Sequence, residues 1–449
     1  MEHCAVALAR GAAAGPDGVS WFPQQHLNPG VKQREVFGWA MYDFANSGYT
    51  TVVLTAVFSA YFVGVVAGRA EWATFAWTLA LSISYAIVMI TMPGIGALAD
   101  LRAAKKRYLA FATLGCVAST AALALAGPGQ VVLAMLLIIC SNAFYSYGES
   151  LSAAFLPELA RRDSLGTVSG WGWSLGYFGG MLALGVSLGF VLWAQGQGMG
   201  AAQFVPVTML FTALIYGVAS LVTFALLTER AVPQPEALRA RGFTASLARL
   251  RATCVNARRY QDFMWLLLCG VFYQGGVAVA VTLAAIYAEQ VIGFKPSETM
   301  VLIFVLNLAA AAGAFSFGFF QDKIGHKLAL GITLIGWIAT CIIAALSTTK
   351  GEFWWAAAIA GACMGSSQSA GRAMVGLFAP ARQLAEFYGL WTFATRLASI
   401  IGPLTYGAIT WATGGNQRIA ILSTTGLFVA GMIALIPVNV ARGRAAAAD

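Results

Sequence analysis

Long apolar runs separated by short polar segments dominate this chain. Twelve runs reach the length of about 20 residues that an α-helix needs to cross the hydrocarbon core of a bilayer. The predicted spans cover residues 37–66, 75–98, 108–126, 130–154, 168–193, 204–227, 263–290, 299–320, 328–347, 353–378, 388–411 and 418–440. Because the number of spans is even, both ends of the chain are predicted to lie on the same side of the membrane.

Composition supports this pattern. Hydrophobic residues make up 59% of the 449 positions, charged residues make up 10%, and the mean hydropathy is +0.74. A soluble domain carries about 25% charged residues, so a soluble fold is excluded. We predict an all-α membrane protein with 12 transmembrane helices.

The distribution of Lys and Arg predicts the orientation. A cytoplasmic N-terminus places 21 of them inside and four outside, namely Arg69, Lys295, Lys350 and Arg418. Basic residues gather on the cytoplasmic side of membrane proteins. We therefore predict an integral protein of the bacterial inner (plasma) membrane with both termini cytoplasmic. The net charge of +9 then reflects topology, and nucleic acid is not an expected partner.

Besides short loops, two tails and a long linker lie outside the spans. Residues 1–34 lack periodicity and predict a disordered cytoplasmic tail, and residues 441–449 are predicted to form a second cytoplasmic tail. Residues 229–262 form a long cytoplasmic linker. Its apolar residues, spaced between arginines, suit an amphipathic helix on the anionic inner leaflet, and a solvated linker between halves is the alternative.

A short motif occurs twice, each time after the second helix of a group of six. The complete copy contains Gly318, Asp322, Lys323, Gly325 and Lys327. The looser copy has Gly96, Asp100, Lys106 and Arg107, with Arg102 one place late and alanine in place of the second glycine. Glycine lets helices approach closely, and the charges predict a latch that holds two helices in one conformation. The first latch is expected to be the weaker.

The repeat extends beyond this motif. Asp100 and Asp322 are 222 residues apart, and Gly180 and Pro403 are 223 apart. This register predicts two six-helix halves, residues 35–228 and 263–440. Such a duplicated chain resembles the major facilitator superfamily, and the resemblance implies a substrate site near the midplane and halves that rock to alternate access.

Further segments are similar to one branch of that superfamily. They read YDFANSGYTT (42–51), FLPEL (155–159), VSGWGWSLGYFGG (168–180), QSAGR (368–372) and AEFYGL (385–390). Together they resemble the vacuole effluxer-like (autophagy-related amino-acid effluxer-like) branch over about residues 35–440. The resemblance implies a permease that exports amino acids or similar small metabolites. In the seventh helix the chain departs from the branch, with Tyr273-Gln274-Gly275-Gly276 where Tyr-Asn-Asp-Gly is frequent.

Four ionisable residues fall clearly within the spans. Each costs about 2.5–3.5 kcal/mol on insertion scales, so each is a functional candidate. The N-terminal half supplies Asp43 and Glu149, and the C-terminal half supplies Arg372 and Arg396. Glu149 and Arg372 are related by the repeat, which predicts a charge pair between them or a cavity of complementary charge. A zwitterionic amino acid has an ammonium group for Asp43 or Glu149 and a carboxylate for Arg372 or Arg396.

Neutral polar residues in the spans complete the candidate lining. Those taken as site residues are Asn46, Tyr273, Gln274 and Gln368, although a hydrogen bond between helices is the commoner role for any one of them. Three roles remain open for the charges: contact with substrate or proton, an intracellular gate, or packing. A carboxylate that loses its arginine on opening would accept a proton, which would couple transport to the proton gradient.

Other functional classes find little support. The three histidines lie outside the spans, and no catalytic set, metal-ligand spacing or phosphate loop is present, so neither an enzyme nor a cofactor is predicted. The expected partners are the lipid bilayer and a small-molecule substrate. The alternatives to an amino-acid exporter are an efflux permease for drugs or other metabolites, and a receptor on the same fold that does not transport.

Overall fold

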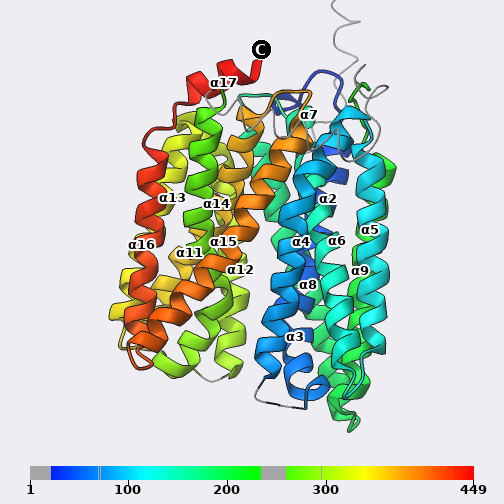
Figure 1. Cartoon of the computed structure of the whole chain (residues 1–449), viewed down its shortest axis with the longest axis vertical. Helices are drawn as coiled ribbons and strands as arrows, with labels where there is room; N and C mark the ends of the chain where they lie inside the picture. The colour runs from blue at the N-terminus through cyan, green and yellow to red at the C-terminus, as the bar shows by residue number, and fades with distance from the viewer. Residues whose placement is uncertain (1–21, 69, 71, 234–258, 295, 449) are drawn as a thin grey trace, which may run out of the picture.

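The computed structural model describes residues 22–68, 70, 72–233, 259–294 and 296–448. Within these ranges, twelve long helical stretches form two bundles that lie side by side (Figure 1). The predicted 12-helix major facilitator fold is confirmed. The N-terminal bundle holds α2 (Gln33–Tyr49) with η2 (Thr50–Ala56), α3 (Phe58–Tyr61) and η3 (Phe62–Val66), then α4 (Ala73–Leu101), α5 (Lys105–Ala122) with η4 (Leu123–Leu125), α6 (Val131–Ala153), α8 (Leu165–Gly196) and α9 (Ala201–Leu226).

The C-terminal bundle repeats this order. It holds α11 (Gln261–Tyr287) with η6 (Ala288–Ile292), α12 (Pro296–Ile324), α13 (His326–Leu346), α14 (Lys350–Phe378), α15 (Leu384–Ala412) and α16 (Gln417–Leu435). Ten of the described helical stretches are long and apolar enough to cross a membrane by length and composition alone. The two below that threshold, α14 and α15, contain Arg372 and Arg396, so polar residues concentrate where the sequence predicts function.

Each half is closed by an equivalent ion pair. In the N-terminal half, Arg230 after α9 donates to both oxygens of Glu35 at the start of α2, at 2.7 and 3.0 Å. In the C-terminal half, Arg442 after α16 donates to both oxygens of Asp262 at the start of α11, at 2.7 and 2.8 Å. The first and last helices of each half are thus tied at one end of the bundle, which we call the basic end. It also carries α7 (Leu156–Leu159) and α17 (Val440–Ala448) (Figure 1).

The predicted N-terminal tail differs in part from the structure. Residues 22–34 were expected to be disordered, but Leu27 and Val31 are buried and the backbone N–H of Asn28 donates to the Leu159 carbonyl at 2.9 Å. The C-terminal tail forms α17, fixed by Arg442. Hydrogen bonds hold both segments in place, although neither segment shows an apolar periodicity. The remainder of the N-terminal tail, residues 1–21, and the linker's predicted amphipathic helix at 234–258 lie outside the described residues.

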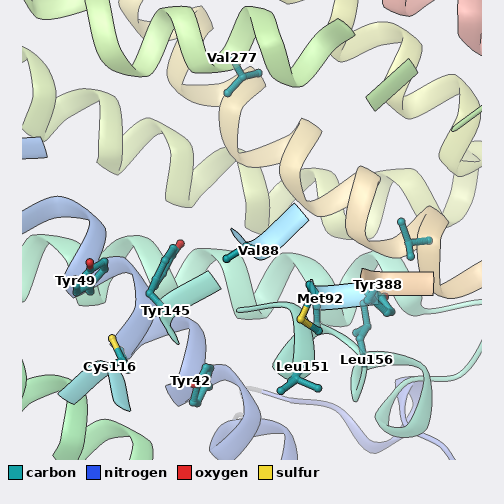
Figure 2. Close-up of a cluster of buried hydrophobic side chains, with 14 of the residues drawn as sticks. Tyr42, Tyr49, Val88, Met92, Cys116, Tyr145, Leu151, Leu156, Val277 and Tyr388 are labelled. Carbon is teal, nitrogen blue, oxygen red and sulfur yellow. The ribbon is translucent and has the colours of Figure 1, made fainter. Parts of the chain in front are cut away.

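The halves meet through small residues near the basic end. A Cβ on Gly96 of α4 would collide with the Ala385 carbonyl of α15, and one on Gly170 of α8 would come within 2.4 Å of the Ala314 carbonyl of α12. The largest hydrophobic cluster continues across this boundary (Figure 2), where Met92 of α4 and Leu156 of α7 lie near Tyr388 of α15. The ribbons of the two halves diverge toward the other end (Figure 1).

Candidate functional site

Asp43 and Arg372 form an ion pair between the two halves. The Arg372 Nη1 donates to the Asp43 Oδ2 at 2.6 Å, joining α2 to α14. The same guanidinium donates through Nε to the Ser169 Oγ at 3.0 Å and through Nη2 to the Ser169 carbonyl at 2.7 Å. Three acceptors from two N-terminal helices therefore hold Arg372, and they satisfy most of its hydrogen-bonding capacity.

Aromatic rings and a glycine enclose this pair. The Arg372 guanidinium carbon lies 4.8 Å from the ring centre of Trp39 and 5.3 Å from that of Trp173, distances at which a cation is attracted to the ring face. A Cβ on Gly172 would come within 2.5 Å of Asp43 Oδ2 and 2.7 Å of Arg372 Nη2. Any side chain at 172 would therefore have to displace the members of this pair.

Glu149 and Arg396 form a second ion pair, which joins α6 to α15. The Arg396 guanidinium carbon lies 5.5 and 5.8 Å from the ring centres of Tyr85 and Tyr145. This pair is more open than the first, because the Glu149 side chain is 35% exposed, whereas that of Asp43 is 12% exposed. The Arg396 Nε is buried without a hydrogen-bond partner among the described residues. The Nε–H of Arg396 is thus a free hydrogen-bond donor among the described residues, whereas the Nε–H of Arg372 is bonded to Ser169.

The predicted pairing of Glu149 with Arg372 is wrong. All four intramembrane charges do meet their opposites across the halves, but Arg372 binds Asp43 and Arg396 binds Glu149. The repeat register identifies equivalent positions, and equivalence does not imply contact. In this arrangement α14 packs against α8, and α15 packs against α4 and α6.

The neutral candidates fall into two groups. Gln274 of α11 and Gln368 of α14 donate to each other at 2.8 and 3.1 Å, and the Gln274 amide also donates to the hydroxyl of the fully buried Tyr273 at 3.3 Å. These three link helices within the C-terminal half. Asn46 lies inside the N-terminal half, where its Oδ1 accepts from Tyr216 at 2.8 Å. It does not reach either ion pair.

Several site residues escaped the sequence reasoning. Ser169 provides two of the three acceptors for Arg372, while Trp39, Trp173 and Tyr85 supply rings around the arginines. Serine and aromatic residues are common in spans, so their type alone carries no signal. The available signal was the glycine spacing in α8, since Gly172 and Gly176 lie against Asp43 and Ser47 of α2 and mark the face that approaches the charge.

The two repeated motifs join the halves at the basic end. Asp322 of α12 accepts from the backbone N–H groups of Gly166 and Thr167 at 2.9 and 2.7 Å, in the first turn of α8. Asp100 of α4 accepts from the backbone N–H of Glu386 at 2.9 Å, in the first turn of α15. A carboxylate is stabilised at a helix N-terminus by free N–H groups and by the helix dipole. We call these two contacts the cross-half latches.

The basic residues of the motifs act elsewhere. The Lys106 ammonium donates to the Leu227 carbonyl after α9. The Lys327 ammonium donates to the Ile436 and Val438 carbonyls after α16 at 2.7 and 2.8 Å. Both lysines therefore donate hydrogen bonds to carbonyl groups just after the sixth helix of their own half. In the structure the acids connect the halves, and these lysines fix each half internally.

We predict that Asp322→Asn lowers the initial transport rate about fivefold and leaves the melting temperature nearly unchanged. The amide loses the negative charge at the α8 N-terminus, an interaction of about 0.3–1 kcal/mol, or up to ~2 when partly buried. Asp100→Asn is expected to have a smaller effect, because its motif is incomplete. Rates in proteoliposomes and thermal unfolding of both variants check this, and a larger loss from Asp100→Asn would contradict it.

Comparison with known proteins agrees with this architecture. The model of the family "Vacuole effluxer Atg22 like" matches residues 59–448. The uncharacterized MFS-type transporter YxiO of Bacillus subtilis is 27% identical over 410 residues, which cover 88% of this chain and 93% of that protein. Autophagy-related protein 22-1 of Penicillium rubens is 25% identical over 209 residues, which cover 43% of this chain and 35% of that protein.

Solved structures of transporters share the fold. The human organic anion transporter MFSD10 superposes with a TM-score of 0.69 at 17% identity, covering 90% of this chain and 99% of that one. The fucose:proton symporter FucP of E. coli gives 0.67 at 15% identity, covering 90% and 98%. Since the family model spans most of the sequence, this chain belongs to the vacuole effluxer Atg22-like family of the major facilitator superfamily.

Proposed function

We propose that this transporter exports small zwitterionic metabolites, amino acids foremost, from the cytoplasm by alternating access. The observation that carries the proposal is the separation of charge across the halves. Both negative partners belong to the N-terminal half and both positive partners to the C-terminal half. A zwitterion offers its ammonium to one half and its carboxylate to the other, and arginine suits a carboxylate because its planar fork can bind both oxygens.

The two pairs have different roles in this proposal. Asp43 and Arg372 are enclosed, and Arg372 makes three hydrogen bonds to the N-terminal half. This arrangement suits a gate that closes when the two halves come together at the basic end. Glu149 and Arg396 are more exposed and keep an unpartnered Nε, which suits direct contact with the ligand. The rings of Tyr85 and Tyr145 beside Arg396 would pack against the apolar part of the substrate.

We propose proton coupling as well, and the same geometry supports it. When the halves separate at the basic end, Asp43 and Arg372 move apart, because they belong to different halves. A carboxylate that moves away from its cation loses the attraction that favours its charged form, so it takes up a proton more readily. Asp43 would therefore accept a proton on opening and release it on closing. The fold relative FucP is itself named a fucose:proton symporter.

The proposal places the basic end in the cytoplasm, in line with the distribution of Lys and Arg. Single cysteines substituted for Lys350, on the opposite end, and Asp163, on the basic end, check this orientation. In intact cells an impermeant maleimide is expected to label the first alone. Labelling at 163 alone would reverse the assignment.

Flux in proteoliposomes tests the function. Purified protein is screened by thermal shift against amino acids, the corresponding amines and the N-acetylated acids. Stabilising compounds are then loaded into vesicles with and without an inside-acidic pH gradient. We expect zwitterions to exchange across the membrane and the gradient to accelerate them. Binding without flux would indicate a receptor, and flux of the N-acetylated acids alone would indicate an organic-anion transporter.

A further inference from the structure

Residues 22–31, here the N-terminal strap, lie across the basic end and are anchored to the N-terminal half. The Asn28 side chain donates to the Pro157 and Glu158 carbonyls, both at 3.0 Å. The Arg161 backbone N–H donates to the His26 carbonyl at 3.0 Å. The Phe22 ring lies 5.2 Å from the ring of Trp171 in α8. These contacts fix the strap against α7 and the start of α8.

His26 of the strap also reaches the other half. Its ring centre lies 5.7 Å from that of Trp171 in α8 and 6.1 Å from that of Phe319 in α12. Its Nδ1 forms a hydrogen bond with the hydroxyl of Ser164, the N-cap residue of α8, at 3.0 Å. The same turn of α8 binds Asp322 through Gly166 and Thr167. His26, from the N-terminal half, and Asp322, from the C-terminal half, thus both bind the start of α8.

The boundary beneath the strap has to open in every transport cycle. A Cβ on Gly318 of α12 would lie 3.0 Å from the Gly166 carbonyl and 3.3 Å from the Cα of Gly170 in α8, so the two backbones touch. Opening of the basic end requires α8 and α12 to part there. Because the strap is anchored to the α8 side, the contact of His26 with Phe319 has to break at the same time.

We infer that the N-terminal strap is a working part of the gate, in which His26 is a positioning residue that stabilises the closed basic end by bridging α8 and α12. It acts on conformational exchange and touches neither of the two ion pairs. The inference is independent of which substrate is carried. It requires only that the halves of this transporter move apart at the basic end.

Accessibility of a buried position at the boundary tests the role. Ser369 is fully buried, where its hydroxyl accepts from Gln321 Nε2 at 3.3 Å and donates to the Gly166 carbonyl at 3.4 Å. In a background whose native cysteines are replaced, Ser369→Cys in nanodiscs should react with a maleimide only when the basic end opens. We expect His26→Ala and Asn28→Ala each to raise the labelling rate about fivefold, the lower range of couplings between sites.

Matched variants separate a bridging role from general loosening. Phe37 of α2 is exposed and its ring lies 6.4 Å from that of Phe22, so Phe37→Ala trims a ring beside the strap within one half. It is expected to leave labelling unchanged. In a double-mutant cycle, His26→Ala and Phe319→Ala should combine less than additively.

Thermal unfolding is measured on every variant so that labelling is compared only among folded proteins. Asp322→Asn serves as the positive reference, since it removes a latch at the same turn. Labelling of His26→Ala within twofold of the parent would overturn the inference, as would an equal rise in Phe37→Ala. Full additivity of His26→Ala with Phe319→Ala would overturn the bridge between α8 and α12.

Discussion

Arg372→Gln is expected to reduce transport about a hundredfold and to lower the melting temperature of the purified protein. Removing one member of a buried ion pair typically costs about 3–5 kcal/mol, because the remaining charge is left uncompensated. Here the remaining charge is Asp43, whose side chain is 12% exposed. The two hydrogen bonds to Ser169 and the stacking on Trp39 and Trp173 are lost as well.

The double variant Asp43→Asn with Arg372→Gln provides the control. It removes both charges, so it should be more stable than Arg372→Gln alone even though it does not transport. Initial rates and thermal unfolding of the two single variants and the double variant complete a mutant cycle. If the effects on stability simply added, the pair would not interact and its role as a gate would be refuted.

The intramembrane charges could be found from the sequence, but their pairing could not. Asp43, Glu149, Arg372 and Arg396 stand out because an ionisable group in a span is costly. Which acid meets which arginine depends on the packing of α14 beside α8 and of α15 beside α6. The repeat relates Glu149 to Arg372 by pseudo-symmetry, and that relation says nothing about distance in one conformation.

The motifs and the strap show the same limit. Gly318 and Asp322 predicted a latch between helices. The partners of Asp322 could not be predicted, because they are the backbone N–H groups of Gly166 and Thr167, and a pattern of side chains does not identify backbone partners. The strap has no apolar periodicity. Its order comes from backbone hydrogen bonds and from Asn28. Sequence reasoning therefore located the helices and charges well, and it missed contacts made through the main chain.

Arg396→Gln is expected to weaken binding of a zwitterionic substrate about ten- to a hundredfold with little loss of thermal stability. Glu149→Gln is expected to weaken binding and also to lower the melting temperature, because it leaves Arg396, whose side chain is 13% exposed, without its partner. Hydrogen bonds to charged groups contribute about 1.5–3 kcal/mol, and Glu149 is exposed enough for water to compensate its partner's loss. At Arg372, by contrast, we expect a large loss of stability as well as of transport. Binding titrations and thermal unfolding measure both quantities.

Arg396→Lys is the matched control at this pair. It keeps the positive charge but loses the planar fork that binds both oxygens of a carboxylate. We expect it to retain the stability of the parent and to bind the substrate more weakly, with the amine analogue unaffected. Equal binding by Lys and Arg at 396 would argue against bidentate recognition of a carboxylate.

The charge swap Glu149→Arg with Arg396→Glu separates a ligand site from a second gate. A gate needs only attraction between α6 and α15, which the swapped pair retains. Oriented recognition needs the negative charge in the N-terminal half and the positive charge in the C-terminal half, beside Tyr85 and Tyr145. We expect the swap to restore expression and stability relative to either single reversal, while transport stays at background. Recovery of transport in the swapped protein would mean that the pair acts as a gate, and that the substrate is bound elsewhere.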